Sequence, residues 1–308
     1  MKPMVEVNPA KIAHYYGHRT FYRDENDYIP KAKAILETVG NLRLVGETGT
    51  GKSTIVEAMC QEFGWELHQY QLSTETSRMD LLAQDILVPD GMGGTAIKPR
   101  LGVIAESILR PKNPKVPQVL FLDEFNYAQP SVLTIMNSLT DGRRNVRIPE
   151  LAETEYFPLG DPIVIRPDNH YVIIGMNPSE KTQYSGTISM NIAQLRRFES
   201  LNIKYLSKSA EYEVVEKTLA QKNQTIDYLD FEPLLKLASW SREQYMDERL
   251  STPITTGNLI NYAKLLKAGL DLLDIREIIN AMYKDDERER INKQLTTLAQ
   301  AKGDSVGA

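Results

Sequence analysis

Residues 46–53 read Gly46-Glu47-Thr48-Gly49-Thr50-Gly51-Lys52-Ser53, which matches the pattern GxxxxGK followed by Ser or Thr. This stretch follows the apolar run Leu42–Val45 and leads into residues with helical spacing. Its glycines let the backbone curl so that successive N–H groups point inward at phosphate oxygens, and the next helix adds the positive end of its dipole. A chance glycine-rich turn is the alternative, but the patterns on both sides favour a phosphate-binding loop.

Two residues of this loop have separate chemical tasks. Lys52 is expected to reach the β- and γ-phosphates of a nucleoside triphosphate, and the Ser53 hydroxyl is expected to ligate Mg²⁺. The cofactors predicted from the motif are therefore ATP and Mg²⁺. The residues assigned to nucleotide binding are Gly46, Glu47, Thr48, Gly49, Thr50, Gly51, Lys52, Ser53 and Thr54, together with Asp123 from a second motif.

That second motif is the apolar run Val119–Leu122, which ends in Asp123 and Glu124. At the carboxyl end of a strand, Asp123 is expected to hold Mg²⁺ with Ser53, and Glu124 to orient and polarise the attacking water. Acids that cap the next helix would give the same pattern. The pairing with the phosphate loop favours the catalytic interpretation, and the second acid separates hydrolysing motors from nucleotide kinases, which exclude water.

Two further positions are candidates for catalysis. Asn177 follows the apolar run Tyr171–Met176, and its amide could hydrogen-bond the γ-phosphate or the attacking water. An Asn-Pro turn ending a strand is the alternative, but the position after the acid-tipped strand favours the functional role. Arg196 and Arg197 close a helical stretch before another strand, where an arginine could enter a neighbouring subunit's site. A pair of solvated helix-end arginines fits that spacing equally well.

Strand and helix patterns alternate through the first two thirds of the chain, and this favours a mostly parallel sheet covered on both faces. Strand patterns lie at Leu42–Val45, Leu67–Leu72, Gln118–Leu122, Tyr171–Met176 and Leu201–Tyr205, and a helix pattern lies at Lys31–Val39. Beyond residue 206, amphipathic helices are expected at Ser209–Gln221, Phe231–Tyr245, Thr256–Ala268 and Leu272–Tyr283. The fold class predicted is an α/β sandwich followed by a small all-helical domain.

The predicted domain organisation has four parts. They are an irregular N-terminal leader (1–30), an ATPase core (31–206), a helical lid (207–300) and a disordered tail (301–308). Ser207 or Ser209 is expected to cap the first lid helix, and Thr255 or Thr256 a later one.

Composition excludes several classes of protein. The 308 residues carry a net charge of -5, which argues against sequence-independent binding of nucleic acid. Cys60 is the single cysteine, so neither an intrachain disulfide nor a multi-cysteine zinc site can form. The longest apolar runs have the length of strands, which excludes a membrane-spanning helix, and the start lacks the apolar stretch of a signal peptide. A cytoplasmic location is expected.

The four motifs, in this order, resemble those of an AAA+ ATPase. Two further stretches resemble the hairpins of its MoxR and McrB-like branch: Ser77–Gly102 resembles the helix-2 insert, and Leu139–Tyr171 the pre-sensor-1 hairpin. Over about residues 27–270 the chain is most similar to the ATPase subunit of cobaltochelatase and its CobS-like relatives. The stretches that carry this likeness are Gly49–Thr54, Ser77–Leu81, Tyr184–Asn191, Arg197-Phe198, Leu201–Leu206 and Pro253–Ile260.

The resemblance implies roles for single residues and an assembly. Lys52 and Ser53 correspond to Walker A, Asp123 and Glu124 to Walker B, and Asn177 to sensor 1. Arg197 matches the arginine finger better than Arg196, and such chains assemble as homo-oligomeric rings, commonly hexamers. Where relatives carry Ser-Pro-Arg with the sensor 2 arginine, this chain has Thr255-Thr256-Gly257. Either Arg249 or Arg242 substitutes, or the γ-phosphate is sensed without that arginine.

Three functions compete on the sequence. The first is an ATP-driven remodelling chaperone of the MoxR type, which in relatives often acts with a von Willebrand A-domain partner in metal insertion or cofactor maturation. The second is a DNA-translocating or restriction motor, which the acidic balance disfavours. The third is a slow ATP-gated scaffold, which the absent sensor 2 arginine keeps open and the complete Walker motifs disfavour. The expected partners are a second copy of the chain and a protein client, with neither nucleic acid nor membrane.

Overall fold

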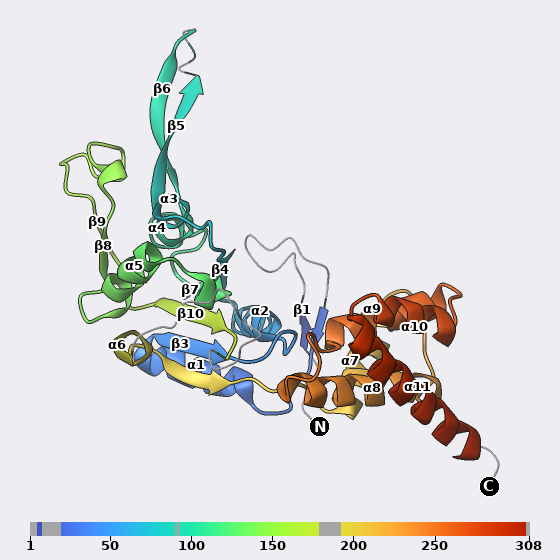
Figure 1. Ribbon diagram of the computed structural model, residues 1–308. Coiled ribbons are helices and arrows are strands. Elements are labelled where there is room, and N and C mark those ends of the chain that lie inside the picture. Colours follow the sequence, from blue (N-terminus) through green and yellow to red (C-terminus); the bar gives the residue numbers. More distant parts are fainter. Residues whose placement is uncertain (1–4, 8–19, 90, 92, 179–191, 306–308) are drawn as a thin grey trace.

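A five-stranded parallel sheet forms the centre of the protein in the computed structural model, which describes residues 5–7, 20–89, 91, 93–178 and 192–305. The strand order is β11-β3-β10-β7-β4 (Figure 1). The bounds are β3 Asn41–Val45, β4 Glu66–Gln71, β7 Gln118–Asp123, β10 His170–Met176 and β11 Glu199–Asn202. Every pairing in this sheet is parallel, as the alternation of strand and helix patterns predicted. The carboxyl ends of β3, β7 and β10 therefore meet at one edge.

Both faces of the sheet are covered by helices. Alternate residues of each strand point to opposite sides, so each face presents apolar side chains that a helix layer can bury. In β7, Val119 and Phe121 join the apolar cluster that contains residues of α1 (Tyr28–Val39) and α2 (Lys52–Phe63). Leu120 and Leu122 join the opposite cluster, with residues of α4 (Val103–Leu109) and α5 (Pro130–Thr140). The predicted αβα sandwich is confirmed.

The C-terminal third is helical and has an apolar core of its own. It comprises α7 Lys208–Ala220, α8 Tyr228–Met246, α9 Thr256–Lys267, α10 Leu272–Asn280 and α11 Asp285–Ser305. Of the expected caps, Ser207 accepts a hydrogen bond from the Ala210 N–H, and Thr255 accepts one from the Asn258 N–H. Residues 203–207 link this helical part to β11, and the part lies beside the carboxyl edge of the sheet (Figure 1).

Several boundaries differ from those predicted. Helix α1 begins at Tyr28 rather than Lys31, because the Asp24 carboxylate accepts hydrogen bonds from the Tyr28 and Ile29 N–H groups at 2.7 and 3.0 Å. Strand β11 ends at Asn202 rather than Tyr205, where the chain turns toward the helical part.

The two ends of the chain also differ from expectation. The predicted irregular leader contains an antiparallel pair, β1 Val5–Val7 with β2 Thr20–Tyr22. Helix α11 is separate from α10 and continues to Ser305 instead of giving way to a tail at residue 301. Acidic residues in its first turn, Asp285–Glu287, suit the positive end of the helix dipole.

Two hairpins project from the α/β core (Figure 1). One pairs β5 Ala83–Pro89 with β6 Thr95–Leu101, just after the short helix α3 Arg78–Leu81. The other pairs β8 Asn145–Arg147 with β9 Ile163–Ile165. The remaining short elements are η2 Phe125–Tyr127, η3 Pro149–Leu151 and α6 Ile192–Leu195. Among the described residues, no helix combines the length and apolarity needed to cross a membrane.

Candidate functional site

The loop between β3 and α2 has the conformation that its glycines predict. Gly49 and Gly51 have φ values of 78° and 89°, in the left-handed region that favours glycine. A Cβ added at Gly46 would lie 2.7 Å from the Ile203 carbonyl oxygen, so the loop passes too close to the chain after β11 for a side chain there. Helix α2 begins at Lys52, and its N-terminus faces the loop.

Lys52 is buried beneath this loop. Its ammonium group donates to the Gly46 carbonyl at 2.8 Å and to Asn177 Oδ1 at 2.9 Å. Burial lowers the pKa of Lys52, and the charges of Asp123, Glu124 and Glu47 act in the opposite direction. A cation held in this place can neutralise phosphate charge.

Ser53 and Asp123 form a pair suited to a divalent cation. The Ser53 hydroxyl donates to Asp123 Oδ2 at 2.5 Å, at the point where α2 approaches the carboxyl end of β7. Both are hard oxygen donors, which Mg²⁺ prefers alongside phosphate and water oxygens. No group of three or more His, Cys, Asp or Glu side chains among the described residues could hold a metal ion. The two oxygen donors of Ser53 and Asp123 leave the remaining ligand positions of Mg²⁺ to water and phosphate oxygens.

Gly175 explains how Asp123 is placed, although no role for this glycine was predicted from the sequence. A Cβ added there would lie 2.4 Å from Asp123 Oδ1 and 3.2 Å from the Phe121 ring. The carboxylate thus rests directly on the backbone of β10. A glycine inside the apolar run Tyr171–Met176 was the available signal, since such a residue often marks a close approach.

Glu124 lies next to this pair in an unusual backbone conformation. Its φ is 53°, and its N–H donates to Asp123 Oδ1 at 2.9 Å. Asn177, almost fully buried, donates from Nδ2 to Glu124 Oε2 at 3.2 Å while its Oδ1 accepts from Lys52. Burial and the Asp123 charge raise the pKa of Glu124, and Lys52 and Asn177 offset part of that rise. A carboxylate with a raised pKa is a better proton acceptor.

A cavity of about 370 Å³ opens above the loop. It is lined by seven consecutive residues, 48–54, from the loop and the start of α2, and by Asp123 and Glu124. Other lining residues come from outside the core motifs: Phe21, Tyr22, Leu206, Val214 and Ile260, to which no role was assigned from the sequence, and Thr255, Thr256 and Gly257, which the resemblance aligned with the sensor 2 motif. Their apolar members can cover a flat base, while the loop N–H groups face phosphates. No local pattern identifies Phe21, Tyr22, Leu206, Val214 or Ile260 as site residues, because they come from β2, the 203–207 link, α7 and α9.

The two arginines considered as substitutes for sensor 2 lie elsewhere. Arg242 is buried and pairs with Glu211 at 2.9 and 2.7 Å, and Arg249 is exposed, 3.9 Å from Asp247. Neither lines the cavity, where Lys52 is the one cationic side chain among the described lining residues.

Arg197 does not reach this cavity. It lies two residues before the start of β11, at the amino end of the sheet, whereas the phosphate loop lies at the carboxyl end. Its guanidinium donates to Asn137 Oδ1 at 2.9 Å and to the Ala193 carbonyl at 3.1 Å. The structure thus brings Lys52, Ser53, Asp123, Glu124 and Asn177 together and leaves Arg197 apart. Residues 184–191, which contributed to the resemblance, lie outside the described residues.

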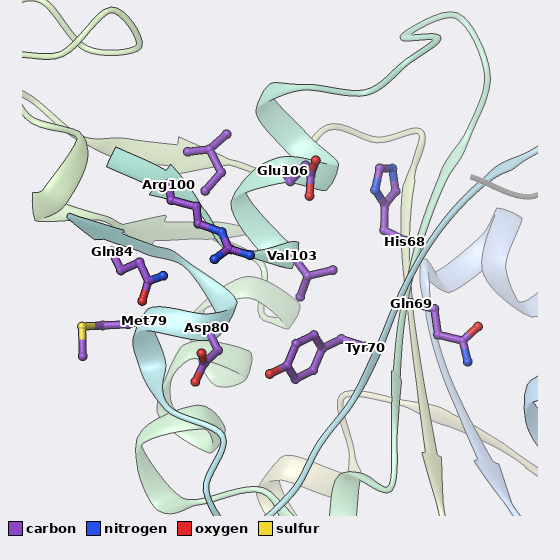
Figure 2. A pocket seen from close by; sticks show the side chains of 11 residues that line it. His68, Gln69, Tyr70, Met79, Asp80, Gln84, Arg100, Val103 and Glu106 are labelled. Carbon is purple, nitrogen blue, oxygen red and sulfur yellow. The ribbon is translucent and has the colours of Figure 1, made fainter. Parts of the chain in front are cut away.

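A second cavity, of about 530 Å³, lies at the outer edge of β4, where α3, β6 and α4 meet at the foot of the first hairpin (Figure 2). Arg100 and Tyr70 extend into it from opposite sides. Both signs of charge line it, from Arg100, Asp80 and Glu106. It contains none of the residues predicted to bind phosphate.

Comparison with known proteins gives a family and distant relatives. The family model "AAA domain (dynein-related subfamily)" matches residues 41–198. An uncharacterized Staphylococcus aureus protein is 24% identical over 270 residues, covering 84% of this chain and 90% of the relative. An uncharacterized Staphylococcus saprophyticus protein is 24% identical over 257 residues, covering 83% of this chain and 85% of the relative.

Two solved structures are also similar. A putative ATPase from Cytophaga hutchinsonii has a TM-score of 0.45 and 15% identity, covering 89% of this chain and 88% of that one. NtrX from Brucella abortus, solved in complex with ADP, has a TM-score of 0.48 and 13% identity. The match covers 76% of this chain and 47% of the NtrX chain.

Proposed function

The chain belongs to the dynein-related subfamily of AAA domains and is an ATPase that uses ATP with Mg²⁺; from this premise we propose that hydrolysis at the Lys52–Glu124 site drives the remodelling of a protein partner. The observation that carries the site assignment is the group formed by Ser53, Asp123, Glu124 and Asn177 around Lys52. Mg²⁺ held by Ser53 and Asp123 would neutralise charge on the phosphate oxygens.

Glu124 is the proposed general base. Its pKa is raised by burial and by Asp123, so the carboxylate can take a proton from water as that water attacks the γ-phosphorus. Asn177 is the proposed orienting group, because its amide contacts Glu124 and Lys52 at the same time. Lys52 is the proposed phosphate ligand from the loop, supported by its burial and its place under Gly46.

Arg197 is proposed to act in a neighbouring subunit's site within a homo-oligomeric ring. Its position at the amino end of the sheet, away from its own phosphate loop, supports this role. A head-to-tail contact would bring the amino end of one sheet to the nucleotide of the next copy, and such contacts close into rings when the rotation permits. A hexamer is the proposed ring size.

A protein partner is supported by apolar side chains on the projecting hairpins. Leu87 and Ile97 are cross-strand partners on β5 and β6 and are 73% and 69% exposed. Leu159, between β8 and β9, is 97% exposed, and Ile165 on β9 is 66% exposed. Exposed apolar groups at projecting positions favour contact with protein. The client class proposed is one that acts with a von Willebrand A-domain protein in metal insertion or cofactor maturation.

The remodelling proposal is tested with a permanently unfolded model protein as client. Addition of this client should raise the ATPase rate of the wild type, and Leu87→Ser with Ile97→Ser should abolish that stimulation while the basal rate stays unchanged. Lys98→Ser is the matched control, because Lys98 pairs with Ile86 on the opposite face of the same hairpin. Stimulation by DNA instead of by the unfolded protein would contradict the proposal.

A further inference from the structure

Tyr205 connects the phosphate loop to the helical part of the chain. It lies in the 203–207 link between β11 and α7. Its hydroxyl donates to the Thr48 carbonyl at 2.7 Å, and its ring lies under the Arg242 guanidinium, with 4.3 Å between Cζ and the ring centroid. One side chain in the link therefore contacts a loop residue of the cavity and a buried residue of α8.

Arg242, which lies over the Tyr205 ring, is fixed by several hydrogen bonds. Its guanidinium donates in bidentate fashion to Glu211, and its Nε donates to the Ile254 carbonyl at 2.8 Å. The two side chains are 6% and 1% exposed, so the pair is sheltered from water and its planar geometry is well defined.

The contacts continue to the cavity. Glu211 Oε1 also accepts a hydrogen bond from the Thr256 hydroxyl at 2.6 Å, and Thr256 is the first residue of α9 and lines the cavity. The preceding residue, Thr255, packs against Gly49, where an added Cβ would lie 2.3 Å from its Cγ2. The helical part thus meets two successive loop residues, Thr48 through Tyr205 and Gly49 through Thr255.

We propose that Tyr205 is a positioning residue that couples the phosphate loop to α9, so that occupancy of the loop sets how the N-terminus of α9 sits over the nucleotide. The chain of contacts runs from Thr48 through Tyr205, Arg242 and Glu211 to Thr256. In this arrangement Arg242 stabilises the helical lid through Glu211 and the Ile254 carbonyl, and it makes no contact with phosphate. The inference rests on the proposed role of this cavity as the ATP site.

The physical reason is the placement of the hydrogen bond. When phosphates bind to the loop N–H groups, the peptide planes of the loop become fixed, and the Thr48 carbonyl is one end of such a plane. The Tyr205 hydroxyl is hydrogen-bonded to that carbonyl, so a change in the carbonyl's orientation moves the Tyr205 ring. The ring contacts the buried Arg242–Glu211 ion pair, which cannot shift without breaking its hydrogen bonds.

Tyr205→Phe tests this coupling because it removes the hydroxyl and keeps the ring over Arg242. The expected result is a fall in kcat of about three- to tenfold, the scale of one lost hydrogen bond, with the KM for ATP changed less than about twofold. Hydrogen exchange adds the direct measurement. In the wild type, addition of ATP should protect the backbone of α9, and in Tyr205→Phe that protection should disappear.

Tyr212→Phe is the matched control. The Tyr212 hydroxyl also donates to a backbone carbonyl, that of Ile226, at 2.7 Å, but both groups lie within the helical part. This variant should keep the wild-type kcat and the ATP-dependent protection of α9. The melting temperatures of the two variants without nucleotide should agree, which separates coupling from general loss of stability.

Each outcome has a defined meaning. If Tyr205→Phe behaves like Tyr212→Phe while the wild type hydrolyses ATP, the coupling is refuted and the ATPase assignment stands. If kcat falls but α9 is still protected by ATP, Tyr205 acts on the loop alone and the coupling is again refuted. A wild-type chain that neither binds nor hydrolyses ATP would refute the proposed function, and this inference with it.

Discussion

Gly175→Ala is the substitution whose effect follows most directly from the geometry. The new methyl would lie 2.4 Å from Asp123 Oδ1, near the carboxyl end of β10, where Gly175 pairs with Leu44 of β3. Because the sheet holds the backbone of β10, the carboxylate must withdraw by roughly 1 Å to reach ordinary contact distance. That movement breaks its 2.5 Å hydrogen bond with Ser53 and separates the two proposed Mg²⁺ ligands.

The expected losses of stability and of Mg²⁺ affinity in Gly175→Ala can be estimated. Extra methyl groups in a packed interior usually cost about 1–3 kcal/mol, so the fold should survive with a lower melting temperature. Disturbing the groups that orient a metal ligand typically weakens metal affinity about 10- to 100-fold. We therefore expect the Mg²⁺ concentration for half-maximal ATPase activity to rise by about one to two orders of magnitude, with part of the activity restored at high Mg²⁺.

The assay is a titration of ATPase rate against Mg²⁺ at saturating ATP, with Gly142→Ala as the matched control. Gly142 has no heavy atom within 4 Å of an added Cβ and no positive φ, so this variant should titrate like the wild type. Wild-type Mg²⁺ dependence in a stably folded Gly175→Ala protein would refute the argument that Asp123 must rest on a bare β10 backbone in order to bind the cation.

Three other predictions concern the same site. Glu124→Gln should bind ATP with near wild-type affinity but hydrolyse it about 10²- to 10⁴-fold more slowly in a single-turnover assay, and wild-type turnover would show that Glu124 is not the base. Because burial raises the pKa of Glu124 and the base acts when deprotonated, kcat should rise with pH along a limb lying above the usual range for glutamate; a pH–rate profile that is flat down to that usual range would contradict this. Mixing the inactive proteins Lys52→Ala and Arg197→Ala should restore part of the ATPase activity, since an arginine finger is worth about 10³–10⁵ in rate and mixed rings contain some complete interfaces; no recovery in rings shown to be mixed would count against action in trans.

The core of the site could be predicted because each of its motifs is a short stretch of sequence. A glycine-rich loop between a strand and a helix carries its conformation in its own residue types, and Asp123, Glu124 and Asn177 each end an apolar run. In a parallel sheet those ends meet at one edge, so the sequence was enough to expect Lys52 near Asn177. In the structure, Lys52 Nζ lies 2.9 Å from Asn177 Oδ1.

The cavity walls could not be predicted in this way. Phe21 and Tyr22 belong to a segment expected to be irregular, and Ile260 looks like any apolar residue of an amphipathic helix. Likewise, the sequence left open whether Arg242 or Arg249 replaces the sensor 2 arginine, or whether the γ-phosphate is sensed without it. Neither arginine lines the cavity, and Arg242 is held in the interior by Glu211, which lies on a different helix.

The αβα sandwich, the helical region after it and the phosphate loop were present in the sequence because periodicity, glycine positions and strand ends are properties of short segments. The approach of Asp123 to Gly175, the contact of Tyr205 with both Thr48 and Arg242, and the distance of Arg197 from its own phosphate loop arise from packing between segments far apart in the chain. The contact of Tyr205 with Arg242 also depends on how the helical part is oriented on the sheet. That orientation is the joint result of many weak interactions, and no single stretch of residues encodes it.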